Sequence, residues 1–101
     1  MSSSSTITDD LSTPGEILKE EFLEPFGLSQ YEVARRIGVD QARISKIVRG
    51  ERTITADTAL LLATLFGTTA EFWLRLQERY DLAQARTHID LNDVRPLTKP
   101  A

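Results

Sequence analysis

Basic side chains are concentrated in one short part of a chain whose overall net charge is −3. Residues 34–50 read ARRIGVDQARISKIVRG, in which five basic side chains are interleaved with small and aliphatic residues. Residues 29–53 hold six bases and three acids, whereas residues 1–28 hold one base and six acids. Because local potential rather than total charge governs the approach of a polyanion, this stretch is a candidate nucleic-acid-binding surface.

The apolar residues of the same stretch have the spacing that two steeply crossing helices require. Ala34 is small where a second helix would pass closely, and Gly38 can take the positive φ of a tight turn. Ile44 and Ile47 lie on one face of the second helix, where they anchor it against the first. Counted from Gln30 as position 1, these four residues occupy positions 5, 9, 15 and 18. This pattern predicts a helix-turn-helix.

The opposite face of the second helix is polar and cationic. At about 100° per residue, Ala42, Lys46 and Arg49 lie opposite the stripe that contains Ile44 and Ile47. In a docked helix-turn-helix, the first residues of the second helix enter the major groove, and helix ends and loops contact phosphates. The predicted base-reading residues are Gln41, Ala42, Arg43 and Lys46. The predicted phosphate-binding residues are Gln30, Ser45, Arg49, Arg52 and Thr53.

These roles follow from the functional groups. Glutamine and arginine match the edges of adenine and guanine, an alanine methyl can contact a thymine methyl, and lysine can reach a base or a phosphate. A charged helix face is more often simply solvated, so a basic helix alone would be weak evidence. The spacing of the apolar residues favours DNA binding over a merely solvated face, because the basic side chains lie on the face that the helix crossing leaves exposed.

Start and stop signals divide the chain into five helices. Capping boxes are expected at Thr13 with Glu16, at Ser29 with Glu32 and at Thr68 with Glu71, and single N-caps at Asp40 and Thr55. The predicted helices span about 14–24, 30–37, 41–49, 55–66 and 69–85, with Pro25, Gly38, Gly50 and Gly67 ending the first four. No segment shows the alternation of a strand, apart from a short piece around HIDL.

The helices define one domain with two tails. Residues 13–86 are expected to form a helix-turn-helix domain, with the motif itself at 29–50. Residues 1–12 are rich in serine and threonine with little to bury, which predicts a disordered tail. Residues 87–101 form a C-terminal extension that contains prolines.

Several classes of protein are excluded by composition. The chain has no cysteine and a single histidine, His88, and it has no glycine-rich phosphate loop, so we expect no enzyme activity, metal site or cofactor. No run approaches the roughly 20 apolar residues of a membrane span, and the N-terminus lacks a secretory signal. The sequence therefore predicts a soluble cytoplasmic protein.

The last helix and the first helix carry candidate protein-binding surfaces. Trp73, Leu76 and Tyr80 form a stripe on the last helix and are the predicted dimer interface, although they would equally well complete the core of one chain. The first helix carries four glutamates, which are either a solvated face or a surface for a basic protein partner: Glu16, Glu20, Glu21 and Glu24.

With these residues placed, the sequence resembles the lambda-repressor-like, Xre-type DNA-binding domains, and more closely the HigA or VapI-type antitoxins. The resemblance covers residues 13–86 and rests on the blocks GEIL…EFL, ITADTALLLA and EFWLRLQ.RYDL, which are more specific than the helix-turn-helix itself. It implies an all-α, five-helix lambda-repressor-like fold. The family's DNA-reading positions fall on Gln41, Ala42, Arg43, Ser45 and Lys46.

The resemblance also implies a function. Antitoxins of this family bind a small RelE-like or HigB-like toxin that cleaves mRNA, and as homodimers they repress the operon that encodes both proteins. Two alternatives remain open: a stand-alone Xre-type transcriptional regulator without a toxin, and a protein-binding adaptor that has lost DNA contact. The basic side chains around residues 43–52 argue against the adaptor.

Overall fold

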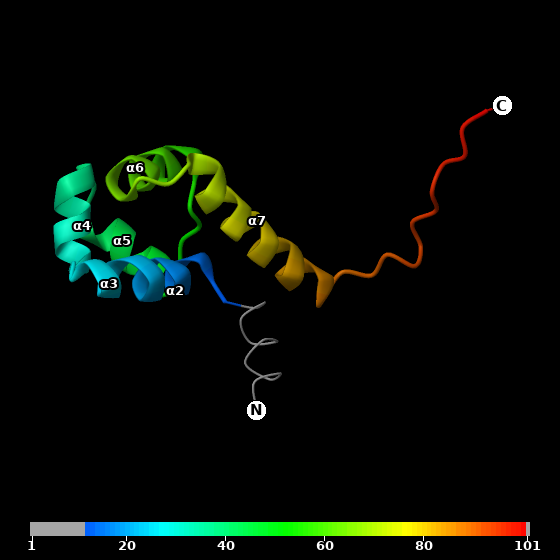
Figure 1. Ribbon diagram of the computed structural model, residues 1–101. Coiled ribbons are helices and arrows are strands. Elements are labelled where there is room, and N and C mark those ends of the chain that lie inside the picture. Colours follow the sequence, from blue (N-terminus) through cyan, green and yellow to red (C-terminus); the bar gives the residue numbers. More distant parts are fainter. Residues whose placement is uncertain (1–11, 101) are drawn as a thin grey trace.

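The computed structural model describes residues 12–100, and within this range the chain forms helices and no strand. The helices lie in five stretches, which confirms the predicted all-α, five-helix lambda-repressor-like fold. Figure 1 shows the first stretch and α6 on opposite sides of the body, with α4 across one end and α7 leaving from the other. The tail predicted at residues 1–12 lies outside the described range except for Ser12.

The first helical stretch begins at the predicted capping box. It consists of α2 (Pro14–Leu18), η1 (Lys19–Leu23) and α3 (Glu24–Phe26), which follow one another without a break. The hydroxyl of Thr13 accepts a hydrogen bond from the backbone N–H of Glu16 at 3.0 Å. The Glu16 carboxylate accepts in turn from the backbone N–H of Thr13 at 2.9 Å. Two backbone donors at the start of the helix are thereby satisfied.

Pro25 does not end this helix, contrary to the prediction. The preceding segment is a π-helical turn, in which the backbone N–H of Glu24 donates to the carbonyl of Lys19. A proline ring inside an α-helix clashes with the carbonyl four residues earlier, and the wider π turn relieves that clash. The helix therefore continues to Phe26 and ends at Gly27, whose φ is 66°.

Four further helices complete the domain: α4 (Gln30–Ile37), α5 (Gln41–Val48), α6 (Ala56–Phe66) and α7 (Ala70–Arg86). Their bounds agree with the predicted bounds to within one residue. At the start of α4, the Ser29 hydroxyl accepts from the backbone N–H of Glu32 at 3.0 Å, as predicted. The Glu32 carboxylate pairs with Arg35 and Arg36 instead of returning to the cap, so only half of that capping box forms.

The predicted caps of α5, α6 and α7 need correction. Asp40 and Thr55 occupy N-cap positions, but neither side chain bonds to the backbone of its helix. The Thr55 hydroxyl donates to the Asp57 carboxylate instead. Helix α7 is capped one residue later than expected, by Thr69, which accepts from the backbone N–H of Phe72 at 3.1 Å.

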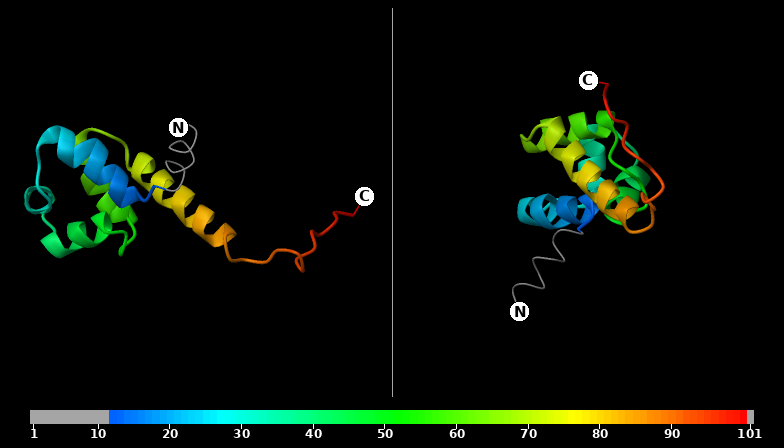
Figure 2. Two further views of the ribbon diagram at one scale, coloured as in Figure 1. Left: turned by 90° about the horizontal axis from the view of Figure 1, so that it is seen from below. Right: turned by 90° about the vertical axis from the view of Figure 1, so that its right-hand side faces the viewer.

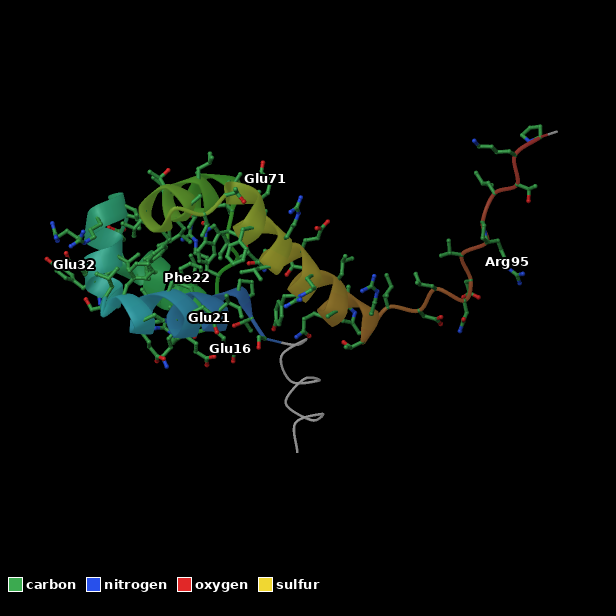
Figure 3. The ribbon with its side chains drawn as sticks, viewed as in Figure 1. Glu16, Glu21, Phe22, Glu32, Glu71 and Arg95 are labelled. Atoms are coloured by element: carbon green, nitrogen blue, oxygen red, sulfur yellow. The ribbon has the colours of Figure 1, made fainter. Side chains whose placement is uncertain are left out.

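Trp73 is the centre of the hydrophobic core. Its indole is 0% exposed and donates from Nε1 to the hydroxyl of Thr68 at 2.7 Å. Phe22 lies 4.8 Å from the indole between ring centroids and points into the body in Figure 3. The other buried hydrophobic residues are Leu18, Leu23, Val33, Ala34, Ile44, Ile47, Ile54, Ala59, Leu62 and Ala63.

The burial of Trp73 corrects the predicted dimer interface. A fully buried side chain offers no surface to a second chain, so Trp73 belongs to the core of its own chain. The other two predicted interface residues, Leu76 and Tyr80, are half-buried and keep part of their surface accessible.

The chain leaves the helical body after α7. Residues 87–100 contain turns but no helix or strand, and Figure 1 and the left view of Figure 2 show them extending away from the other helices. The short extended piece considered around HIDL is not a strand. Across residues 12–100, no helix combines the length and the apolar character that a membrane crossing requires.

Candidate nucleic-acid interface

The helix-turn-helix predicted from residue spacing is formed by α4 and α5. Ala34, Ile44 and Ile47 are at most 2% exposed and hold the two helices together. Gly38 has a φ of 75°, the left-handed conformation predicted for the turn. The chain then reverses through Val39, whose backbone N–H donates to the carbonyl of Ala34 at 3.0 Å. Ala34, Gly38, Ile44 and Ile47 therefore build the helix crossing that their spacing predicted.

The opposite side of α5 faces solvent. Ala42, Lys46 and Arg49 are exposed, as expected for residues on the far side of the helix from Ile44, and Gln41 is exposed as the first residue of α5. Of the other predicted phosphate-binding residues, Arg52 and Thr53 are exposed in the loop that follows α5, and Gln30 and Ser45 are half-buried. All nine predicted DNA-binding side chains thus keep some accessible surface: eight lie on α5 or in the loop after it, and Gln30 lies at the start of α4.

Arg43 is predicted to read a base, but in the structure its side chain contacts residues of α6. Its Nη1 donates to the hydroxyl of Thr58 at 3.3 Å and lies 3.9 Å from the Asp57 carboxylate, both near the start of α6. A hydrogen bond from the Thr55 hydroxyl lowers the pKa of Asp57, and the charge of Arg43 lowers it further. In this conformation Arg43 ties α5 to α6 through one of its five N–H donors.

Two of the predicted phosphate-binding side chains bond to each other. Arg49 donates to the hydroxyl of Ser45 and also forms an ion pair with Glu51 at 3.1 Å. The hydrogen bond from Arg49 lowers the pKa of Glu51, so the carboxylate stays ionised at neutral pH. Glu51 therefore places a negative charge among the cations that are expected to contact phosphates.

Replacement of Glu51 by glutamine is expected to strengthen DNA binding by about two- to fivefold, because it removes a charge that repels phosphate and competes for Arg49. Fluorescence anisotropy with a labelled duplex measures this change. The matched control is Glu71→Gln, which removes an exposed carboxylate at the start of α7 and should leave the affinity unchanged (Figure 3). Unchanged or weaker binding by the Glu51 variant would show that this carboxylate does not oppose DNA.

The first helix approaches the backbone of α5 very closely at Gly15, a contact that our sequence analysis missed. A Cβ atom added to Gly15 would lie 1.9 Å from the carbonyl oxygen of Ile47 and 2.8 Å from the Cα of Val48. Only a residue without a side chain fits there. Gly15 therefore allows α2 to pack directly against the backbone of α5.

Gln77 of α7 positions the loop that follows α5, and this residue was also missed. Its side-chain oxygen accepts from the backbone N–H of Ile54 at 2.8 Å, and its Nε2 donates to Asp81 at 2.9 Å. Gln77 is only 9% exposed and Ile54 only 2%, so the hydrogen bond between them is shielded from water. This loop carries Arg52 and Thr53, so the same bond helps to hold two predicted phosphate contacts.

Replacement of Gln77 by methionine, which is similar in volume, is expected to lower the free energy of unfolding by about 1–3 kcal/mol, because the Ile54 N–H loses its acceptor. Urea unfolding followed by circular dichroism measures the change. Gln84→Met is the control, because Gln84 is exposed on the same helix and its bond to Tyr80 is exposed too; a change below about 0.5 kcal/mol is expected there. Equal stability of the two variants would mean that Gln77 does not hold the loop.

Local patterns pointed to both missed residues. Gly15 follows Pro14 inside a helical pattern, where glycine is less favourable than alanine, and such a glycine can have a packing reason. Gln77 interrupts the apolar stripe that Trp73 and Tyr80 define on α7, and a polar residue on a buried stripe usually has a specific partner.

Comparison with known proteins agrees with this geometry. A family model described as helix-turn-helix matches residues 19–73. Virulence-associated protein I of Dichelobacter nodosus is 47% identical over 89 residues, which cover 87% of this chain and 82% of the relative.

Two solved structures from Pseudomonas aeruginosa have the same fold. The antitoxin HigA, solved with the higBA promoter, is 43% identical with a TM-score of 0.75, over 76% of this chain and 84% of that one. A second protein, solved with its 18-bp operator DNA, is 39% identical with a TM-score of 0.81, over 85% of this chain and 96% of that one. Family and fold are those of DNA-binding regulators and antitoxins. The chain belongs to the Xre-type helix-turn-helix family, among the HigA-type antitoxins.

Proposed function

We propose that this chain binds operator DNA through the exposed face of α5 and represses transcription of its own operon. The observation that carries the proposal is the complete crossing of α4 and α5, which leaves Gln41, Lys46 and Arg49 exposed. Gln41 and Lys46 would contact base edges in the major groove, together with Ala42 and Arg43. The operator-bound relatives support this arrangement.

The proposed regulator acts as a homodimer in the bacterial cytoplasm. A helix-turn-helix protein that reads two half-sites one helical turn apart needs two copies of its second helix, about 34 Å apart. Leu76 and Tyr80 on α7 are the proposed contact between the copies, because their side chains remain partly accessible.

As an antitoxin, the chain would also neutralise a RelE-like or HigB-like toxin that cleaves mRNA. Such a toxin binds a polyanion and is expected to be basic. The first helical stretch carries exposed glutamates, and Glu16 and Glu21 point away from the body in Figure 3. We propose this acidic face as the toxin contact, separate from the DNA-binding face of α5.

The antitoxin role is tested with the reading frame next to this gene. Expression of a small basic protein from that frame should stop growth, and co-expression of this chain should restore it. If no neighbouring product is toxic, the chain is a stand-alone Xre-type regulator.

Charge reversal at Glu20 and Glu24 tests where the toxin binds. It should weaken co-purification with the toxin and leave operator binding intact, because α5 is untouched. Undiminished toxin binding would rule out the acidic face.

A further inference from the structure

The segment after α7 presents aliphatic side chains that its own chain does not cover. Every residue from 87 to 100 is exposed. Four of these residues are large and aliphatic, with exposed fractions between 53% and 99%: Ile89, Leu91, Val94 and Leu97. The first half of the segment also carries two carboxylates, Asp90 and Asp93. A segment with this composition is suited to a partner surface that is apolar and positively charged.

Helix α7 carries a surface of that kind. A shallow groove is lined by Thr69, Phe72, Arg75, Leu76 and Arg79. Phe72 and Leu76 form its half-buried apolar floor. Both arginines are exposed, and neither forms an ion pair with any residue between 12 and 100.

We propose that residues 88–94 of one copy dock into the α7 groove of a second copy, so that two copies exchange their C-terminal segments across the dimer. The aliphatic side chains of the segment cover Phe72 and Leu76, and its two carboxylates pair with Arg75 and Arg79. This inference rests on the homodimer proposed above and identifies the residues that form it.

The geometry of α7 makes the exchange possible. The helix has 17 residues and is therefore about 25 Å long. When two copies pair antiparallel about a two-fold axis at the middle of α7, Leu76 of one copy faces Tyr80 of the other. The same axis places the end of each α7 beside the start of the other, where Thr69 and the groove lie. Each segment leaves its own helix beside Thr69 of the second copy and turns back there, at residues 87–88, to run along the groove towards Arg79.

The charge of the α7 groove and the direction of the C-terminal segment favour a second copy of the chain as the binding partner. The arginines of the groove would repel a basic toxin, and DNA would leave the aliphatic side chains of the segment uncovered. The segment also leads away from the body of its own chain in the left view of Figure 2. A second copy supplies complementary charge and apolar surface at once.

The test uses the full chain in two charge-reversed forms. The first carries Asp90→Arg and Asp93→Arg, and the second carries Arg75→Asp and Arg79→Asp. In either form alone, segment and groove have the same charge, so the dimer dissociation constant measured by sedimentation equilibrium should rise about tenfold or more. Circular dichroism checks that both forms remain helical.

An equimolar mixture of the two forms decides between exchange and other arrangements. In the mixed dimer, each segment meets a groove of opposite charge, so its dissociation constant should return to within about threefold of the parent value. Native mass spectrometry, which separates mixed from unmixed dimers, should show mainly the mixed species. The control form Arg95→Asp with Lys99→Asp changes charge beyond residue 94 and should dimerise like the parent.

Three results would overturn the exchange. Unchanged dimerisation of both reversed forms would show that segment and groove do not meet. Rescue by all four substitutions in one chain, without rescue in the mixture, would mean that the segment folds onto its own α7. A parent chain that is monomeric at tens of micromolar would remove the homodimer as well, whereas operator binding and toxin neutralisation are measured separately and would stand or fall on their own.

Discussion

Replacement of Gly15 by alanine is expected to lower the free energy of unfolding by roughly 3 kcal/mol, because the new methyl group would overlap the backbone of α5. The atoms in its way are the carbonyl of Ile47 and the Cα of Val48. Backbone atoms cannot rotate aside as a flexible side chain does, so α2 and α5 must separate. In a helix without such a neighbour, the same substitution would stabilise by up to about 1 kcal/mol.

Gly67→Ala is the control for this variant. Gly67 ends α6 with a φ of 73°, and no atom lies within 4 Å of an added Cβ. Its replacement should therefore destabilise by only about 1 kcal/mol, the penalty of a left-handed alanine. Urea unfolding followed by circular dichroism measures both variants. Neutral or increased stability of the Gly15 variant would contradict the close approach of α2 to α5.

Replacement of Gln41 by alanine is expected to weaken operator binding by about 1–3 kcal/mol and to relax the sequence preference, because an exposed side chain at the tip of α5 is placed to contact a base. Binding to a scrambled duplex should change little. Arg52→Ala is expected to weaken binding to both duplexes by a similar factor and to reduce the salt slope by about one, as for a phosphate contact.

Titration of labelled duplexes at several salt concentrations separates these two effects. Leu97→Ala serves as a control outside α5 and outside residues 88–94, because its side chain is exposed in the last part of the C-terminal segment. If the Gln41 and Arg52 variants lost the same factor on operator and scrambled DNA, the division into base-reading and phosphate-binding residues would be wrong.

The helix-turn-helix was predictable because its determinants are local. Ala34, Gly38, Ile44 and Ile47 lie within 14 residues of one another, and each has a size or backbone conformation that the crossing demands. The same local logic located the helices to within about one residue. It failed at Pro25. The rule that a proline ends a helix rests on a steric clash in α-helical geometry, and the π turn before Pro25 relieves that clash.

The failures at the candidate site have another cause, because they depend on residues distant in the sequence. The sequence predicted that Arg43 reads a base, but Thr58 lies 15 residues later and accepts a hydrogen bond from its guanidinium at the start of α6. Trp73 fitted an interface stripe as well as a core stripe, and its complete burial within its own chain, where Phe22 packs against it, decides between them. A periodic pattern identifies a buried face without showing which chain buries it.

The most direct test of the central claim compares the affinity of the parent chain for two duplexes at one physiological salt concentration. One duplex contains the promoter of its own operon, and the other contains the same bases in scrambled order. The exposed face of α5 predicts that the promoter binds at least about a thousandfold more tightly, as specific sites do for regulators of this class. Equal affinity for the two duplexes would contradict the assignment of α5 as a sequence-reading helix.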